Sequence, residues 1–365
     1  MSPIDELKRI LRPAGGGLYL VSTGRKEQIA LQKEIYRAKS EEEIDAAYHH
    51  ALDQIATSPI GILGIPSDVG AGFLRGSNLS PLDLRVAASH RPSLQTALRP
   101  LLDVGDVRVV PQILHDEMCS ADQLERTRAA LYPDDSPAVR NQLPASPLSI
   151  AERAVDLMLQ LNPDLRLFSI GGDHACSLPI VTSYAKLVDN LGVVQFDAHT
   201  DMLEERLGIK YCFATWSYHA SRRLKTPGNL VQFGVRASRF PKEHWESKYG
   251  IVQHWATRCL AEPERVIRET IDHYRALGVT KLYISNDIDG TDETFADATG
   301  TPEPNGLLPQ FVGEVYAQLT REFEIVGTDL MEVALAIPRL EGGRARTLET
   351  ALSYWEVSLQ SMAVR

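Results

Sequence analysis

Aspartate and histidine recur at close, regular spacing at two places in the second half of the chain. Asp197, His199 and Asp201 are each two residues apart, and Asp287 and Asp289 repeat that spacing. In an extended backbone, residues spaced in this way point to the same face. Neither cluster contains Lys or Arg, and buried carboxylates repel one another unless a cation compensates them. The pattern therefore indicates a bound metal cation.

A sixth candidate ligand, His174, ends the segment Gly171-Gly-Asp-His. Four carboxylates and two imidazoles form an oxygen-rich set, which favours Mn²⁺ over metals that prefer thiolates. Six ligands with bridging carboxylates suit two ions about 3.5–4 Å apart, which lower the pKa of a shared water from about 15.7 toward about 7. The expected chemistry is hydrolysis at neutral pH. Each motif alone could be a cap, a turn or surface decoration; their joint occurrence favours the metal site.

The clusters follow short apolar runs, which we interpret as strands. The expected strands are 60–65, 107–110, 165–170, 192–196, 230–235, 251–255, 282–285 and 324–329, with helices between most of them, including one that starts at Ser149. Alternating strands and helices indicate an α/β protein with a parallel sheet covered on both faces. A doubly wound sheet and a closed barrel share this pattern. In a doubly wound sheet the site lies at the carboxyl ends of the strands.

Composition is that of a soluble globular protein: 44% of the 365 residues are hydrophobic and 24% are charged. The net charge of −10 argues against a nucleic-acid or anionic-membrane partner. No apolar stretch is long enough to span a membrane, and the four cysteines form no C-x-x-C pair, so we expect a cytoplasmic protein. Residues 1–57 are predicted to be a helical extension, and residues 58–365 the catalytic domain.

The three clusters resemble, in order, the three signatures of the arginase/agmatinase (ureohydrolase) family. These are Gly171-Gly-Asp-His, Asp197-Ala-His-Thr-Asp and Ser285-Asn-Asp-Ile-Asp. Residues 298–306 (Ala-Thr-Gly-Thr-Pro-Glu-Pro-Asn-Gly) and 329–333 (Asp-Leu-Met-Glu-Val) are similar to later family segments. Residues 72–81, with Arg85, and 102–106 resemble weaker landmarks, so the resemblance extends over about 58–340.

The resemblance implies a three-layer α/β/α fold with an eight-stranded, mostly parallel sheet, and a homo-oligomer, either trimer or hexamer. One Mn²⁺ would be held by His174, Asp197, Asp201 and Asp287, and the other by Asp197, His199, Asp287 and Asp289. A bridging hydroxide would attack the guanidinium carbon and release urea and an amine. Glu332 matches the carboxylate that orients the guanidinium, a planar cation that can donate two parallel hydrogen bonds to it.

The chain departs from the family where a histidine usually shuttles protons. Phe213 stands at that position, within Tyr211-Cys-Phe-Ala-Thr-Trp, and cannot transfer a proton. His219 is the replacement that we expect, and the thiol of Cys212 is a second nearby titratable group. The alternative for both is a purely structural role.

The loop after Asp201 lacks the small polar residues that arginases use to bind the amino-acid end of arginine. Arginine is therefore not the favoured substrate. Four charged residues of this loop remain as candidates: Glu204 and Glu205 for a cationic substrate tail, and Arg206 or Lys210 for an anionic one. The competing interpretation is a solvated run of surface charge.

These observations predict a dinuclear manganese hydrolase for a small guanidino compound other than arginine. Nickel is an alternative metal, and formimino-group hydrolysis on the same scaffold is an alternative reaction. A third interpretation is a metal-binding paralogue without activity that acts as a structural or regulatory subunit. Phe213 favours this last interpretation, whereas the complete ligand set and Glu332 oppose it.

Overall fold

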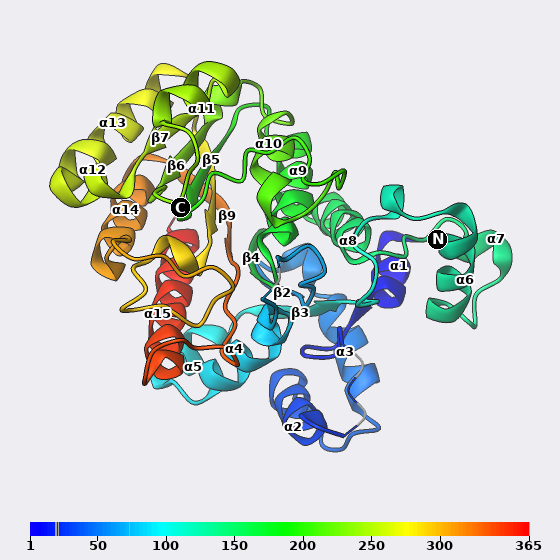
Figure 1. Ribbon diagram of the computed structural model, residues 1–365. Coiled ribbons are helices and arrows are strands. Elements are labelled where there is room, and N and C mark those ends of the chain that lie inside the picture. The colour runs from blue at the N-terminus through cyan, green and yellow to red at the C-terminus, as the bar shows by residue number, and fades with distance from the viewer. Residues whose placement is uncertain (19, 21, 73, 365) are drawn as a thin grey trace.

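The computed structural model describes residues 1–18, 20, 22–72 and 74–364 (Figure 1). Its centre is a nine-stranded sheet with the strand order β1-β3-β2-β4-β9-β8-β5-β6-β7. The strands are β1 Leu11–Arg12, β2 Ile60–Ile65, β3 Leu102–Val107, β4 Arg166–Gly171, β5 Leu191–Phe196, β6 Leu230–Phe233, β7 Val252–His254, β8 Lys281–Asn286 and β9 Glu324–Leu330. The sheet is open, with β1 and β7 at its edges, so the barrel alternative is wrong.

All strand pairs are parallel except the pair of β1 with β3, which is antiparallel. The expected count of eight strands misses β1, a two-residue strand in the N-terminal segment whose length is too short for a periodic pattern. The expected strand at 107–110 is also misplaced, because β3 ends at Val107. Asp103 and Asp106 interrupt the apolar run by which a buried strand is predicted. Both side chains are buried and form ion pairs with Arg85.

Fifteen α-helices connect and cover the strands within the described residues. They are α1 Pro3–Ile10, α2 Arg25–Tyr36, α3 Ile44–Leu52, α4 Ser80–Ser89, α5 Pro92–Leu98, α6 Ala121–Leu131, α7 Pro137–Arg140, α8 Pro147–Leu161, α9 Ser177–Leu187, α10 Trp216–Ser221, α11 Lys242–Tyr249, α12 Ala256–Ala261, α13 Pro263–Ala276, α14 Pro309–Glu322 and α15 Gly343–Ala363. Helix α8 begins before the expected Ser149: Ser146 is its N-cap and Pro147 its first residue, the position that best tolerates proline.

Two hydrophobic cores lie on opposite faces of the sheet, which makes the fold a three-layer α/β/α sandwich. One core contains apolar side chains of α1, α3, α8, α9 and α11. The other contains those of α4, α13, α14 and α15. Because both faces are covered, β2, β4 and β5 are buried at every residue, as expected for parallel strands.

The N-terminal segment, residues 1–57, packs against the rest of the chain in the structure. Leu7 and Ile10 of α1 belong to the same core as α8, and Glu6 accepts two hydrogen bonds from Arg153 of α8, at 2.6 and 2.8 Å. Strand β1 adds to the edge of the sheet. The segment therefore extends the core and the sheet together.

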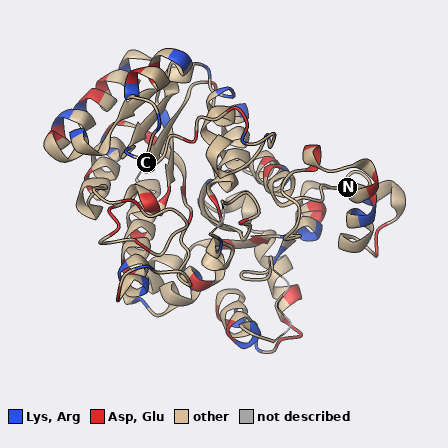
Figure 2. Cartoon of the chain, in the orientation of Figure 1, with Lys and Arg blue, Asp and Glu red and all other residues tan. Residues whose placement is uncertain are grey.

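The outer helices carry charges of both signs. In Figure 2 the positions of acidic and basic residues alternate along α12 and α13, where Arg258 pairs with Glu269 and Arg265 with Glu262. Among the described residues, no helix combines the length and the apolar character needed to cross a membrane.

Candidate metal centre

The carboxyl ends of four neighbouring strands position the acidic and imidazole clusters. His174 follows β4, Asp197 follows β5, Asp287 follows β8 and Glu332 follows β9, and these strands are adjacent in the order β4-β9-β8-β5. Strands β5 and β8 pair in register as far as Phe196 and Asn286. The next residue of each strand is therefore an aspartate at the same edge.

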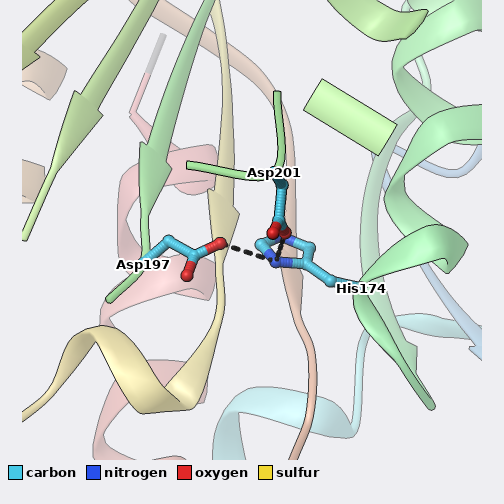
Figure 3. Close-up of side chains that lie close together, drawn as sticks. All are labelled: His174, Asp197 and Asp201. Atoms are coloured by element: carbon cyan, nitrogen blue, oxygen red, sulfur yellow. Dashed lines mark ion pairs between the residues drawn. The ribbon is translucent and has the colours of Figure 1, made fainter. Parts of the chain in front are cut away.

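Around His174 three carboxylates converge on one imidazole nitrogen. Its Nδ1 lies 3.0 Å from Asp287 Oδ2, 3.1 Å from Asp197 Oδ2 and 3.5 Å from Asp201 Oδ2. In Figure 3 the carboxylates of Asp197 and Asp201 both approach the same imidazole nitrogen of His174. All four side chains are buried. Among the described residues, no atom forms a hydrogen bond of good geometry with Nδ1, and a buried nitrogen of this kind needs a partner.

A second group forms around His199 and shares Asp197 with the first. His199 Nδ1 lies 3.1 Å from Asp289 Oδ2 and 3.4 Å from Asp197 Oδ1. The two oxygens of Asp197 therefore face different imidazoles, Oδ2 toward His174 and Oδ1 toward His199. The sets His174–Asp197–Asp201 and Asp197–His199–Asp289 each have the proximity that one metal ion requires.

A hydrogen-bond chain behind His174 selects its tautomer. Its Nε2 lies 3.0 Å from Ser285 Oγ, and that hydroxyl donates to Asp329 Oδ1 at 2.9 Å. The same hydroxyl also lies 3.1 Å from Ser177 Oγ. With its proton on either acceptor, Ser285 accepts from Nε2–H, and Nδ1 is then the nitrogen available to a metal ion. Tyr283 anchors Asp329 with a further hydrogen bond of 2.9 Å. A histidine held by its second nitrogen in this way is typical of metal sites.

The charges of the cluster do not balance without a cation. Burial, together with neighbouring aspartates, raises the pKa values of Asp201 and Asp287 well above the usual range. Burial lowers the pKa of His199, but Asp289 and Asp197 outweigh it and raise that pKa to about 12. Two imidazoles cannot compensate four carboxylates, so the donor set fits divalent cations.

Glu332 lies beside the cluster on a strained backbone. Its φ of 62° is in the left-handed region, where non-glycine residues carry a conformational cost. Two hydrogen bonds hold it there: its N–H donates to Gly172 O at 2.8 Å, and its Oε1 accepts from His174 N at 3.1 Å. Burial and the charges of Asp287 and Asp173 raise the pKa of this carboxyl.

The structure does not bring His219 into the cluster. Its Nε2 lies 3.1 Å from Glu204 O and 3.0 Å from Lys210 O. Because both are acceptors, that nitrogen carries the proton and is engaged by backbone. The ring lines a separate cavity of about 310 Å³ with His115 and Tyr211. Cys212 is buried, and burial raises the pKa of its thiol.

Two residues that the sequence analysis missed support the ligands directly. Trp216 packs its ring on His174, with centroids 4.5 Å apart, and donates from Nε1 to Asp201 Oδ2 at 3.1 Å. Arg236 donates to the carbonyls of Asp289 and Glu303, each at 2.8 Å. No local pattern marks either residue, because their partners are distant in the sequence.

A parallel α/β sandwich with two metal-type clusters at the carboxyl edge of the sheet defines an arginase-fold protein. The sequence profile of the arginase family matches residues 58–354, and the chain belongs to that family.

Among curated relatives, the agmatinase of Neisseria meningitidis serogroup C is 33% identical over 175 residues, which cover 48% of this chain and 53% of that enzyme. The chain thus matches about half the length of that relative. The guanidinobutyrase of Pseudomonas aeruginosa is 27% identical over 283 residues, 74% of this chain and 77% of that enzyme.

Solved structures with the same fold include proclavaminate amidino hydrolase from Streptomyces clavuligerus. Its TM-score is 0.63, with 23% identity over 84% of this chain and 92% of that one. Formimidoylglutamase from Bacillus subtilis has a TM-score of 0.65, with 17% identity over 83% and 86% of the two chains. At these identities the likeness is one of fold.

Proposed function

We propose that the protein is a dinuclear metal hydrolase that cleaves a guanidino compound other than arginine into urea and an amine. The observation that carries the proposal is the position of Asp197, whose two carboxylate oxygens face two different imidazoles. A carboxylate placed between two nitrogen ligands is suited to bridge two cations. The family profile and the agmatinase and guanidinobutyrase relatives support the same reaction class.

The proposed ligands of one ion are His174, Asp197, Asp201 and Asp287, and those of the other are Asp197, His199, Asp287 and Asp289. The unpartnered Nδ1 of His174 supports this assignment. Oxygen-rich ligation favours Mn²⁺, with Ni²⁺ as the alternative. When bound, two divalent cations supply Lewis acidity and a water nucleophile at neutral pH.

The protein's own groups would bind and orient the substrate head. A guanidinium ion is cationic and planar, so it is attracted to the buried acidic cluster and can donate parallel hydrogen bonds to one carboxylate. We assign this role to Glu332, and the support is that its Oε1 accepts from His174 N and its N–H donates to Gly172 O. His219 has no part in the proposal, since its Nε2 is engaged by two carbonyls.

The test is release of urea by metal-loaded protein from a panel of guanidino compounds, with formamide measured in parallel on formimino compounds. Glu332→Gln keeps the size of the side chain but loses a charged acceptor, and we expect kcat/KM to fall by about 100-fold with metal content unchanged. His219→Ala serves as the matched control and should retain turnover. Formamide without urea would favour the formimino reaction, and neither product would favour a non-catalytic subunit.

The assembly and location belong to the same proposal. We expect a homo-oligomer, trimer or hexamer, located in the cytoplasm, without a nucleic-acid or membrane partner. Size-exclusion chromatography with light scattering measures the subunit count.

A further inference from the structure

The charged residues of the loop at 203–210 face different surroundings, although the sequence makes them equivalent candidates. Lys210 Nζ pairs with Glu117 at 2.6 Å. Glu204 turns toward Lys248, at 3.9 Å. Arg206 places its guanidinium over the ring of Phe213, 4.8 Å from the centroid. Lys210 Nζ also lies over the ring of Tyr211, at 4.7 Å, but that ring lines the separate cavity with His219. Of these three, Arg206 is the one stacked on Phe213.

Phe213 connects this arginine to the site. Its N–H donates to Gly70 O at 3.1 Å, and a Cβ built on Gly72 would lie 3.6 Å from its ring. Three residues later, Trp216 packs on His174 and donates to Asp201. The aromatic ring that replaces the family's histidine thus stands at the His174 side of the cluster, with a cation stacked on it.

Stacking positions the Arg206 guanidinium without using its hydrogen-bond donors. A guanidinium on an aromatic face is attracted by the ring quadrupole and keeps its five N–H groups in their own plane. Among the described residues, no carboxylate pairs with Arg206 and no protein acceptor takes its side-chain N–H groups. The side chain is also exposed, so its donors are accessible to a ligand.

The site carries negative charge at its buried end and a positive charge, that of Arg206, near Phe213. The buried end, with four aspartates and Glu332, attracts a cation, whereas Arg206 offers an unpaired cation on the Phe213 side. The carboxylate of Glu303 lies 3.8 Å from His199 Nε2. A ligand with a cationic head and an anionic tail matches Arg206, whereas a second cation on the ligand would have to be bound by the exposed Glu205 or by Glu303.

We propose that Arg206 binds the carboxylate tail of the substrate, so that the preferred substrates are guanidino carboxylates. This inference rests on the proposed function, because it names the tail of the compound that the same site cleaves. Phe213 then has a function of its own: it replaces the family's histidine, and its ring holds the guanidinium of Arg206 by stacking.

The experiment compares three probes with the same head and different tails: 4-guanidinobutyrate, the uncharged butylguanidine and the cationic agmatine. Metal-loaded protein should show kcat/KM for 4-guanidinobutyrate at least about tenfold above agmatine, the effect expected of one charge-assisted hydrogen bond. Arg206→Glu should lower the 4-guanidinobutyrate value by at least the same factor, mainly through KM, and leave butylguanidine within about twofold. Arg206→Lys should restore part of the loss.

Arg222 provides a matched control, because its guanidinium also lies over an aromatic ring, that of Tyr218, at 5.2 Å. Arg222→Glu introduces the same charge change and should leave all three probes unaffected. Equal preference for the three tails, or an Arg206→Glu effect of the same size on all of them, overturns the inference.

Calorimetric binding separates this inference from the proposed function. If no probe yields urea, the hydrolase proposal fails, yet binding of 4-guanidinobutyrate that weakens about tenfold in Arg206→Glu still supports the carboxylate site. If urea forms from butylguanidine or agmatine but 4-guanidinobutyrate binds no better than agmatine, the hydrolase proposal stands and Arg206 has no role in specificity.

Discussion

At the scale of single residues, Asp197 differs from the other acidic groups, including the second proposed bridging ligand Asp287, because its two oxygens face both imidazoles. Asp201 approaches His174 alone, and Asp289 approaches His199 alone. The two outer aspartates should therefore each affect one ion, whereas the shared one should affect both. This distinction follows from the structure and not from the spacing of the motifs.

Metal content should report that distinction. We expect Asp201→Asn and Asp289→Asn each to reduce the metal content from about two ions per chain to about one. Asp197→Asn should lower the metal occupancy of both sites. Elemental analysis after dialysis gives the stoichiometry. Asp164→Asn changes an exposed aspartate remote from the sheet edge and should leave it unchanged. Full metal content in Asp197→Asn would contradict the shared role.

His254 predicts a pH-dependent stability that is unrelated to the metal. Burial lowers its pKa from 6.5 to about 4, and its Nδ1 has no partner among the described residues. The unfolded chain then binds more protons than the folded chain between pH 6.5 and 4, so the free energy of unfolding should fall by about 2–3 kcal/mol on acidification through that window.

Urea unfolding of His254→Gln and of the wild type at several pH values tests this prediction. The stability advantage of the wild type should shrink as the pH falls from about 7.5 to about 4.5. The exposed His50→Gln serves as the control. A wild-type advantage that does not change with pH would exclude His254 as the cause.

At the scale of elements, helix α1 connects the N-terminal segment to the core of the remaining chain. Ser2 caps the helix through a hydrogen bond to Asp5 N, and Pro3 occupies its first turn. Its buried face, with Leu7 and Ile10 fully inaccessible to solvent, packs in the core shared with α8. This segment lies outside the residues matched by the family profile, yet it completes one face of the sheet.

A single truncation in α1 should therefore destabilise the whole protein. We expect Leu7→Ala to lower the free energy of unfolding by about 2–5 kcal/mol, through lost burial and the cavity left behind. Leu187→Ala removes the same atoms from a side chain that is 44% exposed and should cost less than about 0.5 kcal/mol. Equal effects in a denaturant titration would mean that α1 is not part of the cooperative core.

At the scale of the whole molecule, the acidic cluster opposes folding until cations neutralise it. Its carboxylates converge from strands β5, β8 and β9 at one edge of the sheet, so their repulsion acts between segments that are far apart in the chain. Metal binding and global stability should therefore be coupled.

Manganese at 100 times its dissociation constant should stabilise the folded state by about 2.7 kcal/mol per site. Scanning calorimetry with and without chelator measures the resulting rise in Tm. In Asp197→Asn the rise should be much smaller. An equal rise in that variant would place the stabilising metal elsewhere.

The sequence alone predicted the sheet because parallel strands buried on both faces leave long apolar runs. Seven of the eight expected strands overlap observed strands, whereas 107–110 shares only Val107 with β3. Aspartates inside β3 are compensated by Arg85 of α4, and that compensation is not visible in a local pattern. The short β1 was missed for a similar reason, since it exists through its pairing with β3.

The acidic and imidazole clusters could also be predicted from the sequence, because the residues of each cluster lie within a few positions of one another at the end of a single strand. Tertiary structure alone decided which groups meet: it faces the two oxygens of Asp197 toward different histidines, engages His219 with backbone carbonyls, and stacks Arg206 on Phe213. These contacts join segments that are separated along the chain, and their geometry depends on how strands and loops pack, which no local spacing encodes.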